Sequence, residues 1–125
     1  MSDLLLLMSL VVFHEERGQP KKCQYASLEV VHNRSKHDSF PSNMRSVIRQ
    51  PRQFSWTKNP SNLKKPTYEL EAWNESVRVA QDFLSNKTNY TNGAIYFNAK
   101  SMGVRYRTLD NKGKPLLTCG KHVYF

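Results

Sequence analysis

Residues 4–18, LLLLMSLVVFHEERG, join an almost unbroken apolar run to two adjacent carboxylates and a glycine. Ser2 suits the cap of a helix, Asp3 favours its first turn and Gly18 favours its end, so we expect a helix that reaches Glu16. The run is far shorter than the ~20 residues that a membrane-spanning helix needs. We therefore expect a helix buried on most of its sides, with a signal anchor as the alternative.

The spacing of apolar residues predicts three further helices. Pro20 suits the first turn of a second helix that closes near Arg34, and a short third helix opens at residues 41–42 and stops at Pro51. A fourth helix begins near Thr67. Its amphipathic face consists of Leu70, Trp73, Val77, Ala80 and Leu84.

The segments between and after these helices read as extended or irregular. Residues 53–56 are expected to be extended, 57–66 to form an exposed loop, and 94–97 to form a buried extended segment. We expect a turn at 110–113 between two short strands, and residues 122–125 close the chain. The fold class is therefore α+β, mostly helical with a small β element.

Length and composition indicate one globular domain over residues 1–125. The mean hydropathy of −0.67 argues against an integral membrane protein. The 19 Lys and Arg against 10 Asp and Glu give a net charge of +9. Such a surface attracts nucleic acid, acidic lipid or an anionic wall polymer, and the charge alone does not choose among them.

The two cysteines, Cys23 and Cys119, are fewer than a disulfide framework for a small secreted domain usually has. The count favours free buried thiols and leaves a single disulfide open. The four histidines lack the HExxH spacing of zinc sites, and the cysteines lack the paired CxxC spacing. We therefore expect neither a metal nor another cofactor.

Glu15 and Glu16 are the candidate acids. Cleavage of a glycosidic bond needs a carboxylic acid that stays protonated near neutral pH, and apolar surroundings keep it so. Because adjacent helical residues point about 100° apart, only one of the two can face a given cleft. Local chemistry alone favours the plainer interpretation, a pair of solvated helix-end glutamates.

Aromatic, amide and hydroxyl side chains that suit sugar rings occur in two later segments. They are typical of carbohydrate grooves, and they also occur in ordinary cores and turns. These residues are Gln53, Phe54, Ser55, Trp56, Tyr96 and Asn98.

Taken in order, these motifs resemble the SleB-like cell wall hydrolases, a spore-cortex-lytic and phage-encoded family. The resemblance covers nearly the whole chain at compatible spacings. The matching residues are Phe13, Glu15, Arg17, Gly18, Gln24, Ala26, Val30, Val31, Asn33 and Arg34, then Phe40-Pro41, Val47-Ile48, Gln53 to Trp56, Trp73, Ala80, Thr91, Gly93-Ala94, Tyr96-Phe97 and His122 to Phe125.

The resemblance implies a lysozyme-like fold and cleavage of the bond between N-acetylmuramic acid and N-acetylglucosamine. It places the catalytic glutamate on Glu15, because Glu16 occupies the usual alanine position. Gln53, Ser55 and Tyr96 fall on positions expected to line the cleft. Asn98 stands where the family usually has histidine, and we expect it to bind substrate as well.

Other departures from the family pattern lie outside the acid itself. Gln19 replaces a second glutamate, Cys23 replaces a glycine, and Tyr124-Phe125 inverts the final aromatic pair. The changes at Gln19 and Asn98 fall on positions expected to contact the sugar or to support such contacts, so we expect them to affect rate and substrate preference. Because no second carboxylate falls in a matched motif, we expect a lytic transglycosylase that uses one glutamate.

The expected partner is the peptidoglycan glycan strand, bound by a monomer without nucleic acid and without membrane insertion. Two alternatives stay open: a non-catalytic basic binder of cell wall or nucleic acid, and an N-acetylmuramoyl-L-alanine amidase. The residues show no export signal, so we expect the host cytoplasm or a virion, as for a phage endolysin or virion lysin that acts on the bacterial wall.

Overall fold

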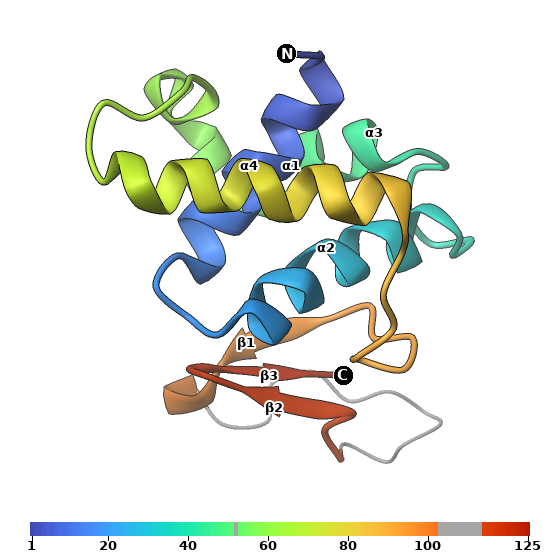
Figure 1. Cartoon of the computed structure of the whole chain (residues 1–125). Helices are drawn as coiled ribbons and strands as arrows, with labels where there is room; N and C mark the ends of the chain where they lie inside the picture. Colours follow the sequence, from blue (N-terminus) through green and yellow to red (C-terminus); the bar gives the residue numbers. More distant parts are fainter. Residues whose placement is uncertain (52, 103–113) are drawn as a thin grey trace.

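The computed structural model describes residues 1–51, 53–102 and 114–125, and in these it has four α-helices and one small sheet (Figure 1). The helices are α1 Asp3–Glu16, α2 Lys21–Ser35, α3 Met44–Arg49 and α4 Leu70–Ser85. The strands are β1 Phe97–Ala99, β2 Leu117–Cys119 and β3 His122–Tyr124. Short 3₁₀ helices span η1 Ser55–Lys58, η2 Pro60–Leu63 and η3 Lys100–Met102.

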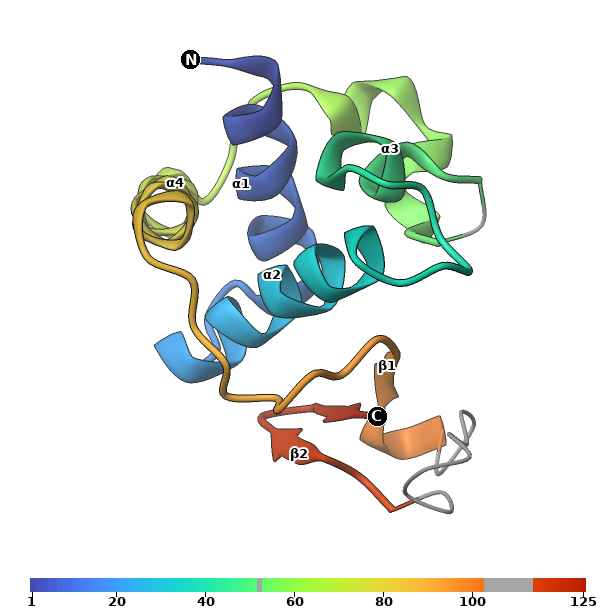
Figure 2. The same ribbon diagram turned by 90° about the vertical axis from the view of Figure 1, so that its right-hand side faces the viewer.

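Helix α1 is the centre of the helical layer, with α4 crossing it and α2 beneath it (Figures 1 and 2). Ser2 caps it as expected, because its side chain accepts a hydrogen bond from the Leu5 amide at 3.1 Å. Every residue from Leu7 to Phe13 is at most 1% exposed. The expectation of a helix buried on most sides is therefore confirmed, and none of the described helices is long and apolar enough to cross a membrane.

Helix α2 separates two apolar clusters. Leu28 and Val31 face the helical core around α1, whereas Ala26 and Val30 face the sheet. The small sheet lies under this second face in both views (Figures 1 and 2). Helix α2 thus fixes the position of the sheet relative to α1, and the position of α1 determines where the candidate acids lie.

The sheet is antiparallel, with β3 between β1 and β2. Ala99 and Cys119 pair with His122 from either side, so the β2–β3 connection is a two-residue hairpin. Gly120 in that turn has a φ of +55°, and a Cβ there would collide with the Gln19 side chain. The turn therefore needs glycine, and it fixes the register that places His122 opposite Ala99.

The segment from α4 to the sheet is fastened to α2 by Glu29, which is buried. One carboxylate oxygen of Glu29 accepts hydrogen bonds from the Thr88 hydroxyl at 2.5 Å and the Tyr90 amide at 2.9 Å. The other accepts from the Thr91 amide at 2.8 Å. These bonds satisfy the buried charge and hold the chain just before β1.

Two expectations about irregular segments were wrong in detail. Residues 53–56 are not wholly extended, because Ser55 and Trp56 open the 3₁₀ helix η1, where the Thr57 amide and hydroxyl both donate to the Phe54 carbonyl. The exposed loop at 57–66 contains a second such helix, η2.

Helix α4 begins at Leu70 because Glu69 adopts a φ of +48°, which interrupts a helix. The expected turn at 110–113 lies outside the described residues.

The preference for free thiols was also wrong. Cys23 and Cys119 form a disulfide, with their Cα atoms 5.4 Å apart. The bond joins the first turn of α2 to the end of β2. The number of cysteines did not predict the disulfide, because a chain of this size can bury a core without such a bond. Whether two cysteines pair depends instead on the distance between them in the fold, which is set by how α2 packs against the sheet.

Candidate active site

A cavity of about 390 Å³ opens where the end of α1 meets the segment around η1 and the edge of the sheet. This volume lies within the range of small-molecule sites. Its walls mix amide, hydroxyl, charged and aromatic groups. The lining residues are Glu15, Gln53, Phe54, Ser55, Lys58, Phe97, Asn98, Ala99, Met102 and His122.

Glu15 contributes a half-buried carboxyl group to this cavity. The indole N–H of Trp56 donates a hydrogen bond to its Oε2 at 2.9 Å. Burial raises the pKa of Glu15, while attraction to His122, the Trp56 hydrogen bond and Lys121 oppose the rise. A carboxyl group with a raised pKa keeps its proton at higher pH, as a general acid requires.

Trp56→Phe should extend the pH range in which the enzyme is active toward higher pH. Phenylalanine keeps an apolar wall but removes the N–H that stabilises the anion, so the pKa of Glu15 should rise further. We expect the basic limb of the pH–rate profile to move up by less than about one unit. Ser55→Ala, which removes a hydroxyl from the same wall, is the matched control, and an equal shift there would contradict the assignment.

Gln53 is oriented by Arg34, which is buried in α2. The Arg34 Nη1 donates to Gln53 Oε1 at 3.1 Å, and its Nε donates to the Ile95 carbonyl at 2.7 Å. The guanidinium also lies over the rings of Phe40 and Tyr96. Because Oε1 of Gln53 accepts a hydrogen bond from Arg34, the amide NH₂ of Gln53 is the group that it can offer to an oxygen atom of a ligand.

The structure brings three of the four expected substrate-binding residues to the cavity. Gln53, Ser55 and Asn98 line it together with Glu15. Tyr96 is not among the described lining residues, and its ring packs edge-on against Phe40 with centroids 6.0 Å apart. The role of Tyr96 in substrate binding stays a prediction. Its observed contacts are with Phe40 and with the guanidinium of Arg34, the residue that orients Gln53.

Sequence reasoning missed His122 as a site residue, although it lay in a matched motif, and it named Trp56 only among the residues of a carbohydrate groove and not as a partner of Glu15. The antiparallel register places His122 opposite Ala99, so this histidine reaches the cavity from a strand far away in sequence. Trp56 reaches Glu15 because η1 turns the chain back toward α1. Glu16 points away from the cavity into the core, and the pair of solvated glutamates is therefore wrong.

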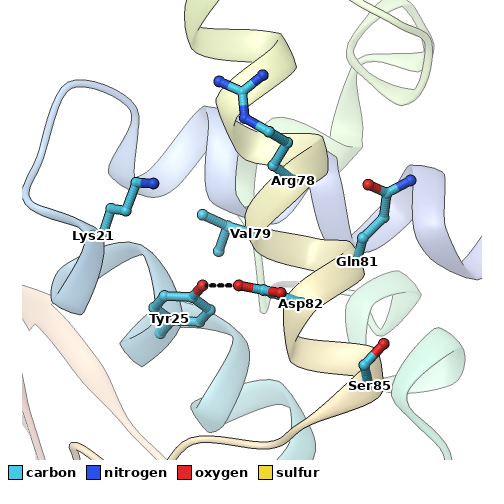
Figure 3. A pocket seen from close by; sticks show the side chains of 7 residues that line it. All are labelled: Lys21, Tyr25, Arg78, Val79, Gln81, Asp82 and Ser85. Atoms are coloured by element: carbon cyan, nitrogen blue, oxygen red, sulfur yellow. Dashed lines mark hydrogen bonds between the residues drawn. The ribbon is translucent and has the colours of Figure 1, made fainter.

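A second hollow lies between α2 and α4, with Lys21, Arg78, Gln81 and Ser85 around it (Figure 3). In Figure 3 the Tyr25 hydroxyl points to the Asp82 carboxylate, and it donates to Asp82 at 2.7 Å. Burial and this bond raise the pKa of Tyr25 to about 12, which keeps the phenol neutral. The charged side chains Lys21 and Arg78 at this hollow are exposed, and the carboxylate of Asp82 already accepts the hydrogen bond from Tyr25. The cavity at Glu15 is therefore the better candidate for an active site.

Among the described residues, no three His, Cys, Asp or Glu side chains come together as a potential metal site.

Comparisons with known proteins give one family and one fold. The model of the family described as Cell Wall Hydrolase matches residues 18–125. The catalytic domain of the germination-specific lytic transglycosylase SleB from Bacillus anthracis superposes with a TM-score of 0.75 and 22% identity, covering 99% of this chain and 94% of that one. The catalytic domain of the Bacillus cereus SleB protein gives 0.74 and 23%, covering 98% and 88%. No curated protein matches.

The shared fold covers the helices and the sheet that surround the cavity, and it confirms the expected mostly helical, lysozyme-like class. The family match begins at Gly18, so it includes Gln53, Ser55 and Asn98 but stops three residues short of Glu15. The case for Glu15 therefore depends on its surroundings in this structure.

Proposed function

Because the chain belongs to the cell wall hydrolase family, we propose that it cleaves the glycan strands of peptidoglycan between N-acetylmuramic acid and N-acetylglucosamine, with Glu15 as general acid. One observation carries the assignment of the acid: Glu15 is half-buried in a cavity lined by amide, hydroxyl and aromatic groups, and burial raises its pKa. The SleB domain from Bacillus anthracis, which is named a lytic transglycosylase, supports this class of reaction.

In the proposed first step, the carboxyl group of Glu15 gives its proton to the glycosidic oxygen while the bond from that oxygen to the muramyl C1 breaks. The resulting carboxylate lies beside developing positive charge on the sugar ring. Gln53 and Asn98 line the cavity, and in this proposal they hold sugar hydroxyl or acetamido groups during the step. Phe54 and Phe97 provide apolar faces against which a sugar ring can lie.

In the proposed second step, the Glu15 carboxylate takes the proton of the 6-hydroxyl as that oxygen bonds to C1. The product is a 1,6-anhydro sugar, Glu15 regains its proton, and no water is consumed. Among the described residues that line the cavity, Glu15 is the only carboxylate. A retaining hydrolase would use a second one about 5 Å away, and an inverting enzyme would use one at about 6.5–9.5 Å.

Mass spectrometry of digested peptidoglycan tests the function and the mechanism together. We expect fragments that end in 1,6-anhydro-N-acetylmuramic acid. Reducing-end muramic acid would mean true hydrolysis, and free stem peptides would mean amidase chemistry. Salt-sensitive binding to walls without any new chain ends would favour the basic, non-catalytic binder that the net charge of +9 also allows.

We propose that the protein acts as a monomer at the bacterial wall, in the setting of a phage endolysin or virion lysin. The disulfide supports an oxidising place of action, because such bonds are rare where thiols are kept reduced. Phage structural genes beside its own gene would support the setting, and sedimentation of the purified protein tests the oligomeric state.

A further inference from the structure

Glu16 is a fully buried carboxylate at the end of α1. Its Oε1 lies 2.5 Å from Nδ1 of His122 and accepts a hydrogen bond from the Tyr124 hydroxyl at 2.8 Å. Among the described residues, its Oε2 has no hydrogen-bond partner. A buried carboxylate is costly unless a nearby positive charge compensates it, and His122 is the basic side chain that contacts Glu16 in the described part of the chain.

His122 connects this buried group to the cavity. Its ring lines the cavity that contains Glu15, while its Nδ1 is engaged by Glu16. The ring also packs edge-on against Phe97, with centroids 5.1 Å apart, which fixes its plane. Since Nδ1 faces Glu16, Nε2 is the ring nitrogen left for the cavity side.

We propose that Glu16 fixes the His122 ring beside Glu15 through its contact with Nδ1, and that the positive charge of His122 stabilises the Glu15 carboxylate once the acid has given up its proton. The inference rests on the proposed function of Glu15. His122 and Glu16 are positioning residues here: His122 acts on the charge of Glu15, and Glu16 acts through His122.

The electrostatics around Glu15 agree with this arrangement. Attraction to His122 is the largest of the effects that lower the pKa of Glu15 against its burial, whereas Glu16 itself raises it. Lys121 on the hairpin also lowers it, and Lys58 lines the same cavity. Burial, followed by the charge of Glu16, strongly raises the pKa of Tyr124, so its hydroxyl remains a neutral donor.

His122→Asn is the main test. The Asn amide can still donate near the Nδ1 position, but the variant has no ring charge. Without the cation, the pKa of Glu15 should rise, and the basic limb of the kcat/KM profile should move up by about one pH unit. We expect kcat to fall more than KM changes, because the charge acts when the carboxylate forms. An unmoved limb would overturn the proposal.

Glu16→Gln shows whether Glu16 acts on Glu15 through His122 or only by direct repulsion, because the two cases move the basic limb of the pH profile in opposite directions. If Glu16 fixes His122 beside Glu15, its loss also weakens the larger attraction between His122 and Glu15, and the basic limb should move up as in His122→Asn. If His122 keeps its place without Glu16, only the repulsion between Glu16 and Glu15 is lost, and the limb should move down. A downward shift would remove Glu16 from the proposal.

Tyr124→Phe is the matched control for a merely structural role. It removes a hydrogen bond to the same Glu16 oxygen but leaves the His122 ring in place. We expect a lower melting temperature and a basic limb at the wild-type pH. A limb displaced as far as in His122→Asn would show that disturbing the buried group is enough, which contradicts a specific role for the cation.

A measurement without substrate separates this inference from the proposed function. The carboxyl carbon of Glu15 can be titrated by ¹³C NMR in the wild type and in His122→Asn. A higher titration midpoint in the variant supports the inference even if no peptidoglycan is cleaved. Equal midpoints would refute it even if the enzyme is active.

Discussion

Glu15→Gln is expected to abolish wall lysis, with a loss of activity of about 10²–10⁴-fold. Glutamine has nearly the shape of glutamate, and its side-chain oxygen can still accept the Trp56 N–H. It has no acidic proton to give to the glycosidic oxygen. The measurement is the fall in turbidity of bacterial walls with wild type and variant in parallel, followed by analysis of the released fragments.

Glu71→Gln is the matched control for this loss, because it makes the same chemical change on the exposed surface of α4. We expect it to clear walls at the wild-type rate. Full lysis by Glu15→Gln would remove Glu15 from the mechanism. Circular dichroism of both variants should match the wild type, so that a loss of activity reports chemistry and not unfolding.

The substitution Glu15→Gln should also raise the stability of the folded protein at neutral pH. Burial raises the pKa of Glu15 in the folded state, so the wild type gains stability from the bound proton below pH 4.5. That contribution is lost as the pH rises through the raised pKa. Glutamine does not ionise, so the melting temperature of the variant should exceed that of the wild type near pH 7 and approach it near pH 4.

Sequence alone predicted the helical layer because its signals are local. Ser2 at the start and Gly18 just past the end bound α1, and the spacing of apolar residues in α4 predicts a helix whatever it packs against. The order of motifs predicted the family. Gln53, Ser55 and Tyr96 were predicted to line the cleft, and Asn98 was predicted to bind substrate. The cavity at Glu15 is lined by Gln53, Ser55 and Asn98, whereas Tyr96 is not among its described lining residues.

The remaining features depend on contacts between distant residues. The sequence of α1 alone does not show whether Glu16 is solvated or buried, because the side chains that contact it, His122 and Tyr124, are more than a hundred residues away in the sequence. Trp56 was expected on an extended piece, but η1 turns its indole toward Glu15. Pairing across such separations is set by tertiary packing, which no local pattern encodes.

Loss of the disulfide is expected to have the largest effect on stability. Cys23 and Cys119 are 96 residues apart, so the bond closes most of the chain into a loop. Constraining a loop of this length in the unfolded chain is worth about 4–5 kcal/mol in the chain-entropy account. We therefore expect the double variant Cys23→Ala, Cys119→Ala to melt roughly 10–20 °C below the wild type.

Reductant provides the internal control for this effect. It should lower the melting temperature of the wild type toward that of the double variant, and it should leave the double variant unchanged. Because the bond anchors β2, and β2 pairs with the strand that carries His122, wall lysis should fail at a lower temperature in both cases. A wild type that melts at the same temperature with and without reductant would mean that packing of α2 against the sheet holds the site together without the covalent link.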